Sequence, residues 1–234
     1  MVKCYRMAVS SIPRGLLVVI EGIDGAGKTT LAQGLRRWLE EVGAPVRVSK
    51  EPTTGPWGTK LRASAASGRL TPQQELKYLI QDRMEHVETL IAPALDAGEI
   101  VILDRYYPST VAYQGAAGMP LNALLDANGF APIPDVLLLL DLPPALGLER
   151  IRARGDEPNL FEVEDALALS REIFLKLEMP KVVIDARQDA AHVQAEAQKA
   201  VLLALTERFR RELSPTDTVE RLTPYLSGQL TATA

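Results

Sequence analysis

The chain has 234 residues, 47% of them hydrophobic, which is enough for one α/β domain with an ample core or for two small domains. The formal net charge is −4 and no long basic run occurs, so DNA and RNA are not expected as partners, whereas small anionic substrates stay possible because their sites are local. The single cysteine, Cys4, excludes a disulfide framework within the chain and fits a reducing cytoplasm.

The two ends of the chain differ from its centre. Residues 1–14 lack the apolar segment of a secretory signal and are expected to form a loose N-terminal extension. No apolar run approaches the ~20 residues that would span a bilayer, so no membrane partner is expected. Residues 214–234 are rich in Ser, Thr, Pro and Gly and are expected to form a loosely ordered tail. A single domain is therefore predicted over residues 15–213.

Five short apolar runs alternate with helical patterns between these ends. The strands are predicted at residues 16–21, 46–49, 100–103, 136–140 and 182–184. The helices are predicted at residues 29–42, 72 to about 97, from 144 onward, 163–178 and around 193–205, with a short helix from about residue 61 and a loop leading into a helix at 106–118. Runs that are apolar on both faces predict an α/β fold with a five-stranded parallel sheet and helices on both of its faces.

The longest predicted helix begins with Thr71 as the N-cap and Pro72 as its first residue. Pro93, near its end, is expected to kink or break it. Residues 51–58, which precede this helix, are rich in breakers and are predicted to be a loop. The core-facing stripe of the helix is expected to contain Leu76, Ile80, Met84, Val87, Ile91 and Leu95.

The first strand leads into a segment that fits the phosphate-binding P-loop pattern, G-x-x-x-x-G-K-S/T. Glycines there allow backbone N–H groups to turn toward phosphate oxygens, and the following helix adds a favourable dipole. Lys28 is expected to reach the β- and γ-phosphates of ATP, and the Thr29 hydroxyl is expected to hold Mg²⁺. A dinucleotide-binding loop fits worse, because it needs a glycine where Thr30 stands. The residues expected to bind ATP here are Gly22, Ile23, Asp24, Gly25, Ala26, Gly27, Lys28, Thr29 and Thr30.

Carboxylates close four of the strands or the turns after them, at the edge of the sheet where ligands bind in open α/β folds. Asp24 and Asp104 are therefore site candidates, and Asp104 is expected to reach Mg²⁺ directly or through water. Arg105 brings a permanent cation into the same cleft and suits a second phosphate, with a structural Asp–Arg ion pair as the alternative. Asp141 and Asp185 are expected to be helix-capping or turn residues.

A charged, breaker-rich segment at residues 152–162 follows the fourth strand and its helix. Arg152 and Arg154 in this segment are candidates to bring a cation to a transferring phosphoryl group, as an arginine-bearing lid does. A solvated charged loop is the alternative interpretation.

Five motifs taken together resemble the thymidylate kinase family of nucleoside monophosphate kinases. They are GIDGAGKTT at 22–30, KEPT at 50–53, DRMEH at 82–86, DRYYPSTVAYQG at 104–115 and RIRARG at 150–155. The resemblance covers about residues 15–205, and the block at 104–115 is its most specific part. It implies a P-loop kinase fold with a short lid, ATP-dependent phosphorylation of dTMP to dTDP with Mg²⁺, and a homodimer.

The resemblance also implies roles for single residues at the acceptor. Asp24 resembles the P-loop acid near the acceptor sugar and phosphate, and Arg105 resembles the arginine on the acceptor phosphate. Arg83 resembles the arginine that hydrogen-bonds the thymine carbonyl edge. Tyr113 resembles the ring that lies against the sugar and disfavours a 2′-hydroxyl. The other expected acceptor-site residues are Glu51, Pro52, Arg62, Leu79, Ser109, Thr110 and Gln114.

On the donor side, members of this family place a catalytic arginine either in the P-loop or in the lid. Gly25 occupies the P-loop position here, so the lid type is implied, with Arg154 and Arg152 as candidates. The segment 186–188 resembles the loop that packs on adenine, which adds Arg187 to the expected ATP site. Arg150, in the lid motif, is expected there as well.

Leu79 departs from the family, which usually has a phenylalanine stacked on thymine at this position. Leucine can cover a base but cannot stack as an aromatic ring does. A related kinase for another pyrimidine nucleotide or nucleoside therefore stays open, as does a nucleotide-binding protein without phosphotransfer. The retained phosphate- and metal-binding residues speak against the latter. His86 is expected to be structural, because phosphoryl transfer needs positioning and charge more than a strong base.

Overall fold

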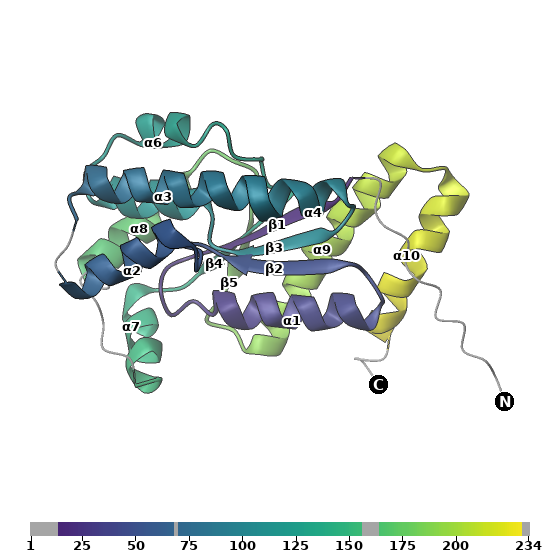
Figure 1. The fold of residues 1–234 in the computed structure, drawn as a ribbon. Helices are drawn as coiled ribbons and strands as arrows, with labels where there is room; N and C mark the ends of the chain where they lie inside the picture. Colours follow the sequence, from purple (N-terminus) through teal and green to yellow (C-terminus); the bar gives the residue numbers. More distant parts are fainter. Residues whose placement is uncertain (1–13, 68–69, 156–163, 231–234) are drawn as a thin grey trace.

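The computed structural model describes residues 14–67, 70–155 and 164–230, so residues 1–13 of the expected extension lie outside it. Five parallel strands form one sheet in the order β2-β3-β1-β4-β5 (Figure 1). This confirms the predicted α/β fold with a five-stranded parallel sheet. The strands are β1 Leu16–Glu21, β2 Val46–Lys50, β3 Ile100–Asp104, β4 Val136–Asp141 and β5 Val182–Asp185.

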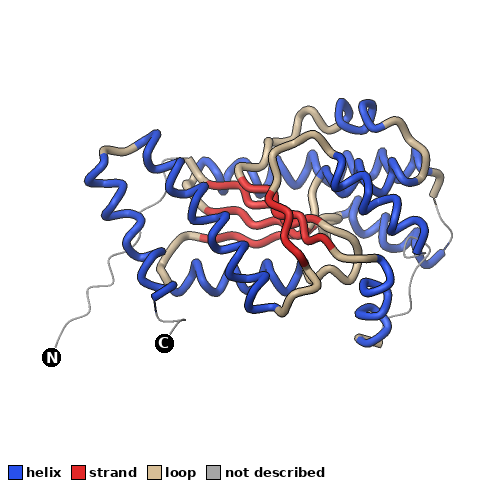
Figure 2. The backbone as a smooth tube through the Cα atoms, turned by 180° about the vertical axis from the view of Figure 1, so that it is seen from behind, coloured by secondary structure: helices blue, strands red, loops and turns tan. Residues whose placement is uncertain are grey.

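Helices lie on both faces of the sheet, which Figure 2 shows from behind. The helices are α1 Lys28–Glu41, α2 Pro56–Ser67, α3 Pro72–His86, the π-helix η1 Val87–Ile91, α4 Ala92–Asp96, α5 Tyr107–Ala116, α6 Leu121–Ala127, α7 Pro144–Ala153, α8 Glu164–Lys176, α9 Ala190–Glu212 and α10 Pro215–Leu230. Three differ from expectation: α2 begins at Pro56 rather than near Leu61, because proline suits the first helical position, while α6 and α10 lie where the sequence predicts no helix. None of the described helices is long and apolar enough to cross a membrane.

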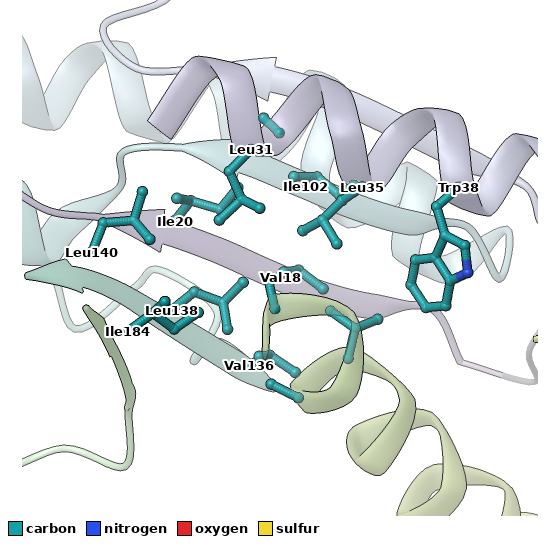
Figure 3. Close-up of a cluster of buried hydrophobic side chains, with 14 of the residues drawn as sticks. Val18, Ile20, Leu31, Leu35, Trp38, Ile102, Val136, Leu138, Leu140 and Ile184 are labelled. Atoms are coloured by element: carbon teal, nitrogen blue, oxygen red, sulfur yellow. The ribbon is translucent and has the colours of Figure 1, made fainter. Parts of the chain in front are cut away.

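The alternation of side chains along β1 explains why both faces are covered. Val18 and Ile20 pack with α1 and α9 on one face (Figure 3), while Leu17 and Val19 pack with η1 and α4 on the other. All four are buried, as are their neighbours in the adjoining strand β3. Because β1 is apolar on both faces, its sequence alone predicts a place inside the sheet, with helices covering each face.

The sheet order places the loops that carry the motifs at one edge. Starting from β1, the chain adds β3 and β2 on one side and β4 and β5 on the other, so the direction of winding reverses at β1. Ligands of such sheets bind beyond the carboxyl ends of the strands at this reversal. The segments that follow β1, β3 and β4 meet there.

The buried face of α3 corrects the expected apolar stripe. Leu76 and Ile80 are only half-buried, and Met84 is 48% exposed. The buried residues of α3 are Glu75, Asp82, Arg83 and His86. They are tolerated because other segments supply partners: the Asp82 carboxylate accepts hydrogen bonds from the backbone N–H (2.7 Å) and hydroxyl (2.6 Å) of Thr53. Hydrophobic periodicity does not detect a polar face that is buried in this way.

The start of this long helix is confirmed, whereas Pro93 does not break it, because α4 continues to Asp96. Thr71 and Gln74 form a reciprocal capping box, and Pro72 follows the cap. Near the other end the helix widens to the π-helix η1, with the Ala92 N–H bonded to the Val87 carbonyl, just before Pro93. A proline ring clashes with the carbonyl four residues before it, and the wider turn relieves that clash.

The C-terminal segment is ordered, so the expectation of a loose tail is wrong for residues 215–230. Here α10 packs against α1 and α9, and Leu222 and Tyr225 are buried. The Tyr225 ring meets Trp38 of α1 edge-on, with the ring centroids 6.3 Å apart. The polar composition of the segment suggested a tail, but one apolar side of a helix is enough to bind it to the core.

Candidate functional site

The P-loop joins β1 to α1 and leaves the start of that helix open for an anion. Gly27 is the N-cap of α1 and provides no side-chain cap, so the first N–H groups of the helix are available to phosphate oxygens. Gly25 has φ +82° and lies against α7: a Cβ atom there would be 2.3 Å from the carbonyl oxygen of Gly147. Only glycine fits at position 25 while α7 keeps this place.

Lys28 lies buried within the loop. Its Nζ atom donates hydrogen bonds to the carbonyl oxygens of Gly22 (3.0 Å) and Ile23 (2.8 Å). Burial lowers the pKa of Lys28 to about 8, and the nearby Arg105 charge acts in the same direction. The ammonium group is thus held at the loop by neutral acceptors, which an anionic phosphate can replace.

Thr29 and Asp104 meet at the start of α1, and their geometry fits Mg²⁺. The Thr29 hydroxyl donates to Asp104 Oδ2. The other carboxylate oxygen, Oδ1, is buried and has no hydrogen-bond partner among the described residues, so it is available to a cation. The described parts of the chain contain no group of three or more His, Cys, Asp or Glu side chains that could hold a metal. Mg²⁺ needs no such cage, because it takes most ligands from water and substrate phosphates.

Arg105 and Asp24 form an ion pair across the cleft from Lys28. Arg105 Nη2 donates to Asp24 Oδ1, and the Tyr113 hydroxyl donates to Asp24 Oδ2 at 2.9 Å. Arg105 has φ +74°, a left-handed conformation that non-glycine residues rarely adopt. Burial would raise the pKa of Asp24, but Arg105 and Lys28 outweigh it and hold that pKa well below its ordinary value. Asp24 is therefore a carboxylate at every physiological pH.

A second buried network centres on Arg83. Its Nε atom donates to Glu51 Oε2 (2.8 Å), and its Nη2 atom donates to the Thr110 hydroxyl (3.1 Å). The third contact is from Nη1 to the Asn128 side-chain oxygen. His86 lies behind this network, with Nδ1 3.0 Å from Glu51 Oε1. His86 does not line the cavity described next, which agrees with a structural role.

These networks border a cavity of about 280 Å³. All eleven residues expected at the acceptor site line it. They are Asp24, Glu51, Pro52, Arg62, Leu79, Arg83, Arg105, Ser109, Thr110, Tyr113 and Gln114. Tyr78, the residue next to Leu79, does not line it and instead packs against Trp57 with ring centroids 5.5 Å apart.

The expected lid and adenine residues lie outside this cavity. Arg152 and Arg154 are exposed at the end of α7, and residues 156–163 of the predicted lid lie outside the described ranges. Arg150 Nη2 donates to the carbonyl oxygen of Ala186 at 3.0 Å, which ties α7 to the turn after β5. Arg187 is mostly exposed and pairs with Asp185 at 2.8 Å.

Several polar residues at the site were missed by the sequence interpretation. Glu75 lines the cavity and accepts a hydrogen bond from the Gln114 amide at 3.2 Å. Asn128 contacts Arg83, but no pattern links two residues so far apart in the chain. Glu21 closes β1 and is fully buried. Its signal was present, because it is the one charged residue of the strand predicted at 16–21 and stands directly before the P-loop.

The arrangement can hold two anionic groups near each other. One place is the open N-terminus of α1 with Lys28, and the other is the cavity that contains Arg105. Thr29 and Asp104 lie where a metal ion could contact a phosphate bound at the first place. Two phosphate sites and a metal site at the edge of one sheet suit the transfer of a phosphoryl group.

Comparison with known proteins agrees with this geometry. The family model described as thymidylate kinase matches residues 20–197. The chain is 60% identical to a thymidylate kinase of Xanthomonas campestris pv. campestris (strain B100), over 95% of this chain and 98% of that protein. It has the same identity and coverage with a thymidylate kinase of Xanthomonas oryzae pv. oryzae (strain PXO99A). A thymidylate kinase of Xylella fastidiosa (strain M12) is 59% identical over 85% of this chain and 92% of its own length.

Proposed function

The chain belongs to the thymidylate kinase family, and we propose that the site described above transfers the γ-phosphoryl group of ATP to dTMP, giving dTDP and ADP. One observation carries the assignment of the site: a single cavity gathers every expected acceptor residue and ends at the P-loop residue Asp24. In this proposal the cavity holds dTMP and the P-loop holds the triphosphate of ATP.

The donor phosphates bind at the N-terminus of α1. The N–H groups of the P-loop surround them, and Lys28 exchanges the carbonyl oxygens of Gly22 and Ile23 for phosphate oxygens. Thr29 and Asp104 hold Mg²⁺, which neutralises charge on the β- and γ-phosphates when it is bound.

The acceptor lies with its phosphate at Arg105 and its base at Arg83. The ion pair with Asp24 keeps the Arg105 guanidinium at the cavity wall before the substrate arrives. Glu51 and Thr110 hold Arg83 from behind, so the guanidinium presents a fixed edge to the base. Arg62 lies at the cavity too, and its Nη1 atom donates to the Pro52 carbonyl oxygen at 3.0 Å.

In this proposal the catalytic arginine comes from the lid and not from the P-loop. An arginine at position 25 would place its Cβ atom against the backbone of Gly147, so the P-loop has no room for one there. Arg152 lies in the last turn of α7 and Arg154 directly follows that helix, which touches the P-loop through Gly147. Arg150 and Arg187 lie at the turn after β5, and we assign them to the ATP site beside the adenine.

Substrate identity and the role of the P-loop are tested together. ADP release is measured in a coupled assay with dTMP, dUMP, UMP, dCMP and the nucleoside thymidine as acceptors. We expect dTMP to give the highest kcat/KM. Replacing Lys28 with Ala should lower turnover about a hundredfold or more, because phosphate charge stabilisation is lost. Turnover of the variant at the wild-type rate would contradict the assignment of this loop to catalysis.

Two copies of the chain form a homodimer in this proposal. Its support is a set of large apolar side chains that are exposed on α3, on α6 and in the loop after α6. These are Met84, Leu121, Leu125, Phe130 and Ile133. Light scattering should report a dimer for the wild type and a monomer for Ile133→Glu. The matched control is Val219→Glu, at another exposed apolar position, on α10 (65% exposed against 80% for Ile133), which should stay dimeric.

The proposed compartment is the cytoplasm. Its support is the use of ATP as a donor and the presence of one cysteine in 234 residues, which needs no oxidising environment.

A further inference from the structure

Glu21, the last residue of β1, is a carboxylate with no solvent exposure. Its Oε1 atom accepts hydrogen bonds from the backbone N–H groups of Tyr106 (2.9 Å) and Ser109 (3.0 Å). Its Oε2 atom accepts one from the Ser109 hydroxyl at 2.5 Å. The donors lie at the start of α5, shortly after Arg105: Tyr106 is its N-cap and Ser109 is in its first turn.

The two bonds to Oε1 cap α5 from a different element. Tyr106 is the N-cap residue of α5 and its side chain makes no capping hydrogen bond. Ser109, at the third helical position, donates its N–H group to the carbonyl oxygen of Tyr106 at 3.1 Å. Glu21 gives that group a second acceptor from the neighbouring strand. A neutral side-chain oxygen can serve as a cap equally well, so capping alone does not explain a buried charge.

The charge of Glu21 is costly to bury. Burial raises the pKa of Glu21 to about 7, although Ser109, Arg105, Tyr106 and Lys28 all favour the ionised form. A buried carboxylate that is retained at such cost is expected to have a function beyond packing.

The Ser109 hydroxyl connects this carboxylate to Arg105. It donates its one proton to Glu21 Oε2, so only its lone pairs are left for Arg105, whose Nη1 atom donates to it at 3.2 Å. The direction of the hydroxyl is thus set by Glu21. Arg105 also has a left-handed backbone conformation. The N–H group of the next residue, Tyr106, donates to Glu21, so Glu21 contacts the backbone beside Arg105 as well.

We propose that Glu21 is a positioning residue that orients Arg105 toward the acceptor phosphate through the Ser109 hydroxyl. The inference rests on the proposed role of Arg105 as the acceptor-phosphate ligand and extends it to a residue that would not itself touch either substrate.

The variant Glu21→Gln separates the two tasks of this side chain. One amide oxygen replaces Oε1 and can still accept both backbone N–H bonds, so the cap is kept. The amide NH₂ group replaces Oε2 and cannot accept from the Ser109 hydroxyl, so the connection to Arg105 is lost. At about pH 8, above the pKa of Glu21, we expect KM for dTMP to rise about tenfold, as when one charge-assisted hydrogen bond is weakened. We expect KM for ATP to stay unchanged.

Two further variants keep the test decisive. Ser109→Ala removes the connecting hydroxyl and should raise KM for dTMP to a similar extent, and the double variant should be no worse than either single one, because both break one path. Glu99→Gln is the matched control, since Glu99 pairs with Arg47 at 2.7 Å at the other end of the sheet. It should leave both KM values unchanged.

Failure of the inference is distinguishable from failure of the proposed function. Arg105→Ala should raise KM for dTMP strongly, and if it does not, the proposed role of Arg105 is wrong. If Arg105→Ala has this effect while Glu21→Gln leaves KM for dTMP unchanged, the inference about Glu21 is overturned. Equal increases in KM for dTMP and ATP in Glu21→Gln would also overturn it, because they indicate a general structural role.

Discussion

The buried charge of Glu21 should lower the stability of the fold at alkaline pH. Burial raises the pKa of this carboxyl from its ordinary value of 4.5 to about 7. An acid with a raised folded-state pKa contributes stability below its unfolded pKa and loses it as the pH rises through the folded pKa. The loss should therefore begin near pH 4.5 and be complete above about pH 7.

The magnitude follows from the same values. A rise of the pKa from 4.5 to about 7 corresponds to about 3 kcal/mol of unfolding free energy, at about 1.36 kcal/mol per pKa unit. Glu21→Gln removes the charge and keeps the shape and the two backbone hydrogen bonds. At about pH 8 we therefore expect the variant to be more stable than the wild type by up to about 3 kcal/mol, with the gain shrinking toward zero near pH 5.

Urea unfolding at a series of pH values measures this difference. Glu99→Gln is again the control, because its pKa is lowered by Arg47 and the substitution should have the opposite sign. That change should be small, since exposed ion pairs contribute under about 1 kcal/mol. A Glu21→Gln variant that is less stable than the wild type at about pH 8 would refute the reasoning. Together with a raised KM for dTMP, a stability gain would mark Glu21 as a residue kept for function at the expense of stability.

Three other predictions concern catalysis and specificity. Arg154→Ala should lower kcat and kcat/KM together, because an interaction made mainly in the transition state affects both; a rise in KM for ATP alone would make Arg154 a binding residue, and Arg152 would be tested next. Tyr113→Ala should relax the preference for deoxyribose, measured as the rate ratio of dUMP to UMP, and a wild type that uses both equally would contradict the role of the ring. Leu79→Phe should lower KM for dTMP several-fold with little change in kcat, because stacking is worth roughly 1–3 kcal/mol per base and leucine recovers only part of it. An unchanged KM would show that another group already covers the base.

The structure sharpens the prediction for Leu79. Tyr78 was the nearest other source of a stacking ring, but it packs against Trp57 and does not line the cavity. Phe174 lies edge-on to Tyr113 with centroids 6.3 Å apart and does not line the cavity either. The aromatic residues that line the cavity are Tyr113, expected at the sugar, and Tyr106, whose ring packs against Tyr107 and the Arg83 guanidinium. We therefore expect Leu79 to cover the base.

The sheet and the P-loop could be predicted from the sequence because each is a local pattern. The three central strands are apolar on both faces, and the structure confirms that they are buried on both. The loop motif fixes a strand, a turn and a helix within a few residues. Such features do not depend on what packs against them.

The polar networks could not be predicted in the same way. Arg83 finds its partners directly after β2, on α5 and at the end of α6, and no spacing rule brings those segments together. For the same reason hydrophobic periodicity predicts the wrong inner face for α3: the groups that are buried there are polar and are satisfied by distant parts of the chain. The helix α10 was not predicted for a different reason: the composition of residues 214–234 is polar, although one side of the helix is apolar and buried.

The cations of the site are each held by an internal acceptor, and this affects which ligands can bind. Lys28 is bonded to P-loop carbonyls, and Arg105 is paired with Asp24, whose pKa is held far below its ordinary value. Without such partners the two cations would repel each other more strongly; the charge of Arg105 already helps to lower the pKa of Lys28 to about 8.

A ligand must therefore exchange with an acceptor that is already in place. A phosphate dianion offers more charge than the carboxylate of Asp24 and can compete for Arg105, whereas a nucleoside without a phosphate offers none. The internal ion pair thus favours monophosphates over nucleosides before any contact with the base is made.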